Sequence, residues 1–141
     1  MKLPDEIQKL IMTLENSKGY KCINQMEGSG FGDCLLEMQS SIGTRIRFVR
    51  DRGDWFVEAS GCMPSSKWYE LSLIKTLFGG NPSTHPMSLD RQMELLQNEL
   101  RRIEELFGPE QLAMTEGKLN HIQNERAKRL FPSFYKTQQD I

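Results

Sequence analysis

The sequence of 141 residues predicts an α+β fold in which helices cover an antiparallel sheet. Alternating patterns typical of strands gather between residues 34 and 60, with short turns between them. Apolar residues at helical spacing precede these strands over residues 4–17 and follow them from residue 65 onward. We therefore expect an antiparallel β-meander of three to four strands, preceded by one helix and followed by three helices packed on the sheet.

The first element is a helix over residues 4–17. Apolar residues recur there at the spacing of one helix face: Ile7, Leu10, Ile11 and Leu14. Pro4 suits the start of a helix, where a missing N–H is harmless, and Asp5 and Glu6 suit the positive end of the helix dipole. A short strand over residues 20–23 follows.

The segment GSGFGD, residues 28–33, partly resembles a nucleotide-binding glycine loop. Asp33 stands where the third glycine of G-x-G-x-x-G belongs, and a strand pattern follows. Because that fingerprint requires a helix after the loop, we interpret the segment as a connector.

Three strands are predicted next, over residues 34–39, 44–50 and 55–60, with a turn at residues 40–43. A loop centred on residues 52–53 places Phe48 opposite Val57 and Arg47 opposite Glu58. A loop of three residues would set Ile46 against Glu58 and is disfavoured. In the favoured register Arg50 lies opposite Trp55, which predicts a cation–π contact.

The turn of this hairpin contains Arg52-Gly53-Asp54, the tripeptide that adhesion ligands present to integrins. Gly53 supplies the positive φ of a tight turn, and the flanking Asp51 and Asp54 suit turn positions. Hairpin chemistry accounts for each residue, so we interpret the tripeptide as a turn.

The same register divides the hairpin into two faces. Five residues share one face and are expected to be buried together: Ile46, Phe48, Trp55, Val57 and Ala59. Val49 and Phe56 lie on the opposite, charged face. Either a helix covers that face, or the pair forms an exposed apolar spot that marks a partner site. The sequence leaves both interpretations open.

Three helices are predicted after the strands. The first begins at Ser65 or Ser66, includes Trp68 and Tyr69 and runs to about Phe78. The second begins at Ser88 and carries one continuous apolar stripe: Leu89, Met93, Leu96, Leu100, Ile103 and Phe107. The third starts at Gly108-Pro109 and runs to about Leu130, with Leu112, Leu119, Ile122 and Leu130 on one face. We expect a single α+β domain over residues 1–132 and a loose tail over residues 133–141.

Composition narrows the classes of function. The 18 basic and 19 acidic residues give a net charge of −1, which argues against a nucleic-acid binder driven by bulk charge. No apolar run approaches the roughly 20 residues that span a bilayer, so no membrane partner is expected. The N-terminus lacks the apolar region of a secretory signal, and three cysteines cannot all pair. The expected location is the cytoplasm, with reduced thiols.

We expect no enzyme, no cofactor and no metal. His85 and His121 are far apart and have no Cys, His or Asp at metal-ligand spacing. Glu104 and Glu105 diverge by about 100° around a helix, so they are no catalytic carboxylate pair. An enzyme remains open only as a dispersed site, for which Cys34 and His121 are the residues to test.

Charge is distributed unevenly in the C-terminal half. Residues 86–125 hold eight acids and four bases, and residues 126–141 have a sum of +3. The acidic segment is either a solvated helix face or a surface for a basic partner. Arg45 and Arg47, with Arg126, Lys128 and Arg129 of the basic C-terminal helix, leave nucleic-acid binding as an alternative.

Four phrases in order, GTRIRFVRDRGDWFVE, WYELSLIKTLFGG, RIEELFGPE and ERAKRLFP, resemble small bacterial immunity proteins encoded beside polymorphic or contact-dependent toxins. The resemblance covers roughly residues 31–132. It implies a protein that binds a cognate toxin in the cytoplasm and occludes its active site. Immunity families share no binding motif, so no functional residue is carried over.

The nature of the toxin determines which residues are expected to contact it. If the toxin is a nuclease, its substrate groove is basic. The candidate contacts are then the acids Glu94, Glu99, Glu104 and Glu105. The apolar pair Val49 and Phe56 is a further candidate contact, whatever the toxin.

Overall fold

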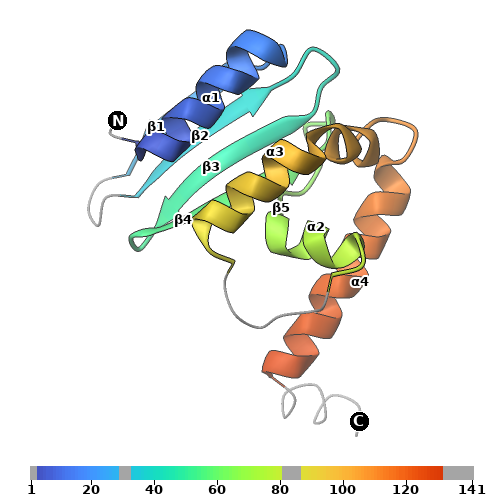
Figure 1. The fold of residues 1–141 in the computed structure, drawn as a ribbon. Coiled ribbons are helices and arrows are strands. Elements are labelled where there is room, and N and C mark those ends of the chain that lie inside the picture. Colours follow the sequence, from blue (N-terminus) through green and yellow to red (C-terminus); the bar gives the residue numbers. More distant parts are fainter. Residues whose placement is uncertain (1–2, 29–32, 81–86, 132–141) are drawn as a thin grey trace, which may run out of the picture.

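A five-stranded antiparallel sheet with the order β1-β2-β3-β4-β5 forms the centre of the fold (Figure 1). The computed structural model describes residues 3–28, 33–80 and 87–131. The strands are β1 (Lys21–Glu27), β2 (Cys34–Gln39), β3 (Arg45–Asp51), β4 (Asp54–Ser60) and β5 (Tyr69–Glu70). The helices are α1 (Asp5–Ser17), α2 (Leu71–Leu77), α3 (Leu89–Leu106) and α4 (Leu112–Leu130). The α+β class and the predicted order of helix, strands and helices are confirmed, with five strands in place of three to four.

Helices α1 and α3 lie on the same face of the sheet (Figure 1). The sheet contributes alternate, fully or nearly buried side chains to this layer: Leu36, Met38, Ile46, Phe48, Val57 and Ala59. The helices contribute Ile7, Leu10 and Leu14 from α1 and Met93, Leu96, Leu100 and Ile103 from α3. Burial of this apolar surface is the main term that stabilises the fold.

The β3–β4 hairpin has the predicted register. Phe48 pairs with Val57, and Arg47 pairs with Glu58. The turn between them consists of Arg52 and Gly53, both with positive φ (53° and 87°). Positive φ at both central residues is the geometry of a type I′ turn, which matches the twist of the two strands. The interpretation of Arg52-Gly53-Asp54 as a turn is therefore confirmed.

The cation–π contacts differ from the prediction. We expected Arg50 to lie over Trp55. Among the described residues, the guanidinium groups of Arg45 and Arg47 instead lie over Trp68, 4.9 and 4.4 Å from the ring centroid. Arg50 shares the inner face of β3 with Phe48, whereas Arg45 and Arg47 share the outer face, which Trp68 reaches from the loop after β4.

The prediction of a helix from Ser65 or Ser66 is wrong, because α2 begins only at Leu71. The residues before it form β5, in which Tyr69 pairs with Ala59 of β4. Tyr69 is buried, and its hydroxyl donates to Asn120 Oδ1 of α4 (2.8 Å). Packing of this tyrosine against the core thus overrides the local serine cap signal.

Helix α3 begins as predicted, since the Ser88 Oγ accepts a hydrogen bond from the Arg91 N–H (3.4 Å). The helix is not continuous, however. Glu99 has non-helical angles (φ −118°, ψ 16°) and marks a kink. No proline or glycine stands between Leu89 and Leu106, so nothing in the local sequence predicts it. From Met93 to Phe107 the apolar stripe stays buried on both sides of the kink.

Helix α4 begins at Leu112, after a turn in which the Gly108 carbonyl accepts from the N–H groups of Gln111 and Leu112. Its buried residues are Leu112, Thr115 and Leu119. Leu130 was expected on the same face but is exposed, because the last turns of α4 run past α2 (Figure 1).

Strand β1 is the outer edge of the sheet and is longer than the predicted strand over residues 20–23. All seven of its residues are exposed. A register shift between Cys22 and Asn24 forms a bulge against β2. After β1, the Gly28 N–H donates to the Asp33 carbonyl (2.7 Å), which brings the two ends of the predicted connector together. The residues between 28 and 33, and the predicted tail over residues 133–141, lie outside the described part.

A buried glutamine closes the opposite side of the sheet. Strand β5 is so short that it pairs only with Glu58 and Ala59 of β4. Beyond it, the Gln92 Oε1 accepts from the Val57 N–H (2.7 Å), and the Gln92 Nε2 donates to the Trp55 carbonyl (3.2 Å). The side-chain amide of Gln92 therefore takes the place of a peptide group from a neighbouring strand.

Candidate functional site

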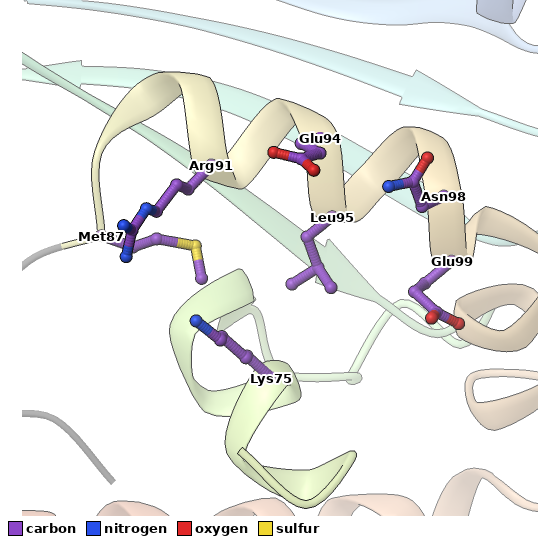
Figure 2. A pocket seen from close by; sticks show the side chains of 7 residues that line it. All are labelled: Lys75, Met87, Arg91, Glu94, Leu95, Asn98 and Glu99. Carbon is purple, nitrogen blue, oxygen red and sulfur yellow. The ribbon is translucent and has the colours of Figure 1, made fainter. Parts of the chain in front are cut away.

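The four candidate acids of α3 do not form one surface. Glu94 and Glu99 line a hollow of about 280 Å³ between α2 and α3 (Figure 2). Lys75 enters this hollow from α2, and Met87 borders it at the start of α3. The hollow mixes both signs of charge with apolar groups, and it does not present a purely acidic face to a partner.

Glu104 is directed into the protein instead. It is half-buried beside Tyr20, which is almost fully buried where the chain enters β1. Burial raises the pKa of Glu104, and the Tyr20 hydroxyl and the charges of Lys18 and Arg101 oppose the rise. Burial, followed by the negative charge of Glu104, raises the pKa of Tyr20. Glu105, the next residue, is exposed.

Val49 and Phe56 lie on the outer face of the sheet, opposite the layer of α1 and α3. They are direct cross-strand partners. Val49 also pairs with Leu35 of β2, and Leu35 pairs with Met26 of β1. Because directly paired residues project to the same face, these four side chains form one line across four strands. We call Met26, Leu35, Val49 and Phe56 the apolar row.

The apolar row is separate from the core. Met26 is 56% exposed, and Leu35, Val49 and Phe56 are half-buried. Phe56 also lines a small hollow with Ser72 of α2 and Arg126 of α4. None of the four belongs to the core cluster or to the side chains that pack against it among the described residues. In Figure 1 the described helices that cover β1 to β3 lie on the other face. Among the described residues, the outer face of β3, to which Val49 belongs, therefore has no helix over it (Figure 1), whereas Phe56 borders a hollow that α2 and α4 help to line.

Charged residues border the apolar row on both sides. Toward the hairpin turn, Asp51 pairs directly with Asp54, and the Asp33 carboxylate accepts from the Arg52 N–H (3.0 Å). On the other side the next paired residues are Glu37, Arg47, Glu58 and Glu70. We call the apolar row and these bordering residues the open sheet face.

A second hollow of about 280 Å³ adjoins the open sheet face near β5. Glu58, Trp68 and Glu70 line one side of it, and Arg126, Leu130 and Phe131 belong to the side formed by the end of α4. Phe131 is 63% exposed. The sequence did not indicate this hollow, because it depends on how α4 lies beside β5.

The arginines proposed for nucleic-acid binding have partners within the protein. Arg45 donates from Nε to the Gly61 carbonyl (2.9 Å) and from Nη2 to the Met63 carbonyl (3.1 Å). Arg47 forms a salt bridge with Glu58. Arg126 approaches Glu70 (3.5 Å between Nη1 and Oε2), and Lys128 approaches Glu125 (3.3 Å). Arg45 thus fastens the 60–66 loop to β3, and Arg126 fastens α4 to β5, whereas the other two pairs lie within the sheet and within α4.

The structure does not bring Cys34 and His121 together. Cys34 begins β2, and His121 is exposed on α4 at the other side of the molecule (Figure 1). Burial raises the pKa of the Cys34 thiol, although Arg50 opposes the rise. A raised pKa lowers the fraction of reactive thiolate at neutral pH.

Two kinds of feature, a metal-binding cluster and a membrane-spanning helix, are absent from the described residues. Over residues 3–28, 33–80 and 87–131, no three His, Cys, Asp or Glu side chains gather in an arrangement that could hold a metal ion. In the same part of the chain, none of the helices has the length and apolar character needed to cross a bilayer. Comparisons with models of protein families, with curated proteins and with solved structures find no match.

Proposed function

We propose that this chain is a small immunity protein that binds a cognate bacterial toxin in the cytoplasm and blocks its active site. The observation that carries the proposal is the apolar row. Four large apolar side chains lie side by side outside the core, on a sheet face without a helix over β1 to β3 in the described residues. Contiguous apolar surface of this kind is typical of a protein-binding site.

The resemblance of the hairpin and helix phrases to immunity proteins supports the same function. The hairpin phrase GTRIRFVRDRGDWFVE supplies two of the four strands of the apolar row. A function in binding also suits the ion pairs beside the apolar row. Arg47 pairs with Glu58 and Arg126 with Glu70, and these contacts fix the shape of the surface.

Co-expression with the product of the neighbouring upstream gene tests this function. We expect the two proteins to co-purify as a stoichiometric complex and this chain to restore growth of cells that express the upstream product. A chain with the same fold class from an unrelated toxin system serves as the control for specificity. The absence of both co-purification and rescue would contradict an immunity function.

Nucleic-acid binding is the weaker alternative. Arg45, Arg47 and Arg126 would have to leave carbonyl or carboxylate partners before they could contact phosphates. We therefore expect no mobility shift of RNA or DNA at low salt, where phosphate contacts are strongest. A shift that weakens steeply with salt would favour this alternative over the immunity function.

A further inference from the structure

We infer that the open sheet face is the surface that binds the toxin, and that it takes a polypeptide segment with apolar side chains flanked by Lys or Arg. This inference rests on the proposed function and specifies the site and the chemistry of the partner. Two observations carry it, the continuity of the apolar row and the charge at its borders.

The row is continuous across the sheet. The pairs Met26–Leu35, Leu35–Val49 and Val49–Phe56 are each in direct register. Cross-strand neighbours on one face are about 4.5–5.5 Å apart, so the row has no gap for a polar group. An extended or helical segment of a partner could therefore bury several apolar side chains along one line.

The borders of the row are acidic. Asp51 and Asp54 face each other directly, an arrangement that is unfavourable for like charges within a hairpin. Two bases and five acids border the row: Arg47 and Arg52, and Asp33, Glu37, Asp51, Asp54 and Glu58. The net charge of these seven residues is −3, and Glu70 adds nothing because Arg126 accompanies it. A partner with basic side chains around an apolar centre complements this distribution.

A second copy of the chain is a poorer occupant. Apolar rows from two copies can face each other with the turn ends together or with the turn ends opposed. The first arrangement brings Asp51 and Asp54 against their own equivalents. The second brings them against Glu37 and Glu58, which outnumber Arg47. In both arrangements negative charge meets negative charge, so a basic partner is favoured.

Two substitutions on the open sheet face test the inference. Val49→Lys interrupts the apolar row, and Asp51→Lys reverses charge at an exposed position beside the turn, where the fold is not at risk. Met12→Lys is the matched control, since Met12 is 59% exposed on α1, away from this face. Glu94→Lys probes the hollow between α2 and α3 as the competing surface. Thermal unfolding of each purified variant confirms that it is folded.

The first measurement is the affinity of each variant for the upstream gene product. We expect the Kd to rise at least 100-fold for Val49→Lys and at least 10-fold for Asp51→Lys. We expect a change of less than threefold for Met12→Lys. If Val49→Lys and Asp51→Lys bind like the unsubstituted chain while Glu94→Lys does not, the inferred surface is wrong and the immunity function stands.

The second measurement does not depend on the toxin. A library of displayed random peptides is selected on the unsubstituted chain and depleted on Val49→Lys. We expect the enriched peptides to carry Lys or Arg on both sides of apolar residues and to bind more weakly as salt rises. Enrichment of acidic or uncharged peptides, or no enrichment, overturns the inference. If basic apolar peptides are enriched but the chain does not bind the upstream product, the inferred binding surface is supported and the proposed immunity function is contradicted.

Discussion

Replacement of the buried Gln92 by leucine is expected to destabilise this protein far more than the same replacement of an exposed glutamine. Gln92 is only 4% exposed, and its amide makes three hydrogen bonds to backbone groups. Leucine fills a similar volume but can neither accept from the Val57 N–H nor donate to the Trp55 carbonyl. Both groups lie on β4 beyond the reach of β5.

The size of the effect follows from these two backbone groups. A buried donor or acceptor that loses its partner costs about 1–3 kcal/mol. Val57 is fully buried, whereas Trp55 is half-buried and its carbonyl regains part of its hydration. Burial of the leucine side chain offsets about 1 kcal/mol of the loss. We therefore expect Gln92→Leu to lower the free energy of unfolding by about 2–4 kcal/mol, a large part of the 5–15 kcal/mol typical of a domain.

Denaturant unfolding at pH 7, combined with amide hydrogen exchange, measures this effect. Gln97→Leu is the matched control, because Gln97 is an exposed residue of the same helix and undergoes the same substitution. The control is expected to change stability by no more than about 0.5 kcal/mol. The Val57 amide should lose protection in Gln92→Leu, while amides in the β2–β3 ladder follow global stability. Equal stability of the two variants would refute the reasoning, as would an unchanged exchange rate at Val57.

Three further predictions concern stability. Arg52→Asn should raise the free energy of unfolding by about 0.5–1 kcal/mol, because asparagine adopts the positive φ of residue 52 more readily than arginine. Gly53→Ala should lower the free energy of unfolding by about 1 kcal/mol, because alanine is strained at the positive φ of residue 53. Unchanged denaturation midpoints would contradict the turn geometry. Arg45→Met should lower the free energy of unfolding by about 1–3 kcal/mol, because carbonyl groups of the 60–66 loop lose their hydrogen-bond donor. Proteolysis within this loop should increase, and a loop that resists proteolysis as before would contradict the prediction. Burial raises the pKa of Glu104 in the folded state, so the folded protein holds the proton of this carboxyl more tightly than the unfolded chain does. Protonated Glu104 therefore stabilises the fold at low pH, and this stabilisation is lost as the pH rises through the raised pKa. Stability of the protein should therefore fall relative to Glu104→Gln between pH 4 and pH 7, and a difference that is constant over this range would show that burial of Glu104 has no such effect.

The β3–β4 hairpin was predictable from the sequence because its determinants are local. The turn residues and the alternation on both sides of it fix one register, and that register is observed. The same logic placed Val49 and Phe56 on the outer face. Leu35 and Met26 were missed as members of the row, because their alignment depends on two further registers. In β2 the available signal was the alternation of side chains, which places Leu35 on the face opposite Leu36 and Met38.

Features that depend on contacts between distant segments were not predictable. Gln92 lies 35 residues from Val57, and a glutamine within a helix is typical of an exposed position, so no local pattern indicates this contact. Strand β5 has two residues, too few for a pattern, and a serine before it imitated a helix cap. The sequence predicts that the four acids of α3 contact one partner together. The helix turn and the kink at Glu99 instead direct them to different neighbours.

The bulge in β1 opposes the addition of a further strand to this edge of the sheet. A strand that added to the free edge of β1 would lengthen the sheet, and repeated addition would link copies into a continuous ribbon. The shift between Cys22 and Asn24 disturbs the even spacing of N–H and C=O groups that an added strand needs. At the other end Gln92 occupies the backbone of β4. Growth of the sheet along its hydrogen-bonding direction is therefore opposed at both ends. This suits the proposed binding site on the flat of the sheet, where association of one partner offers no edge for further copies.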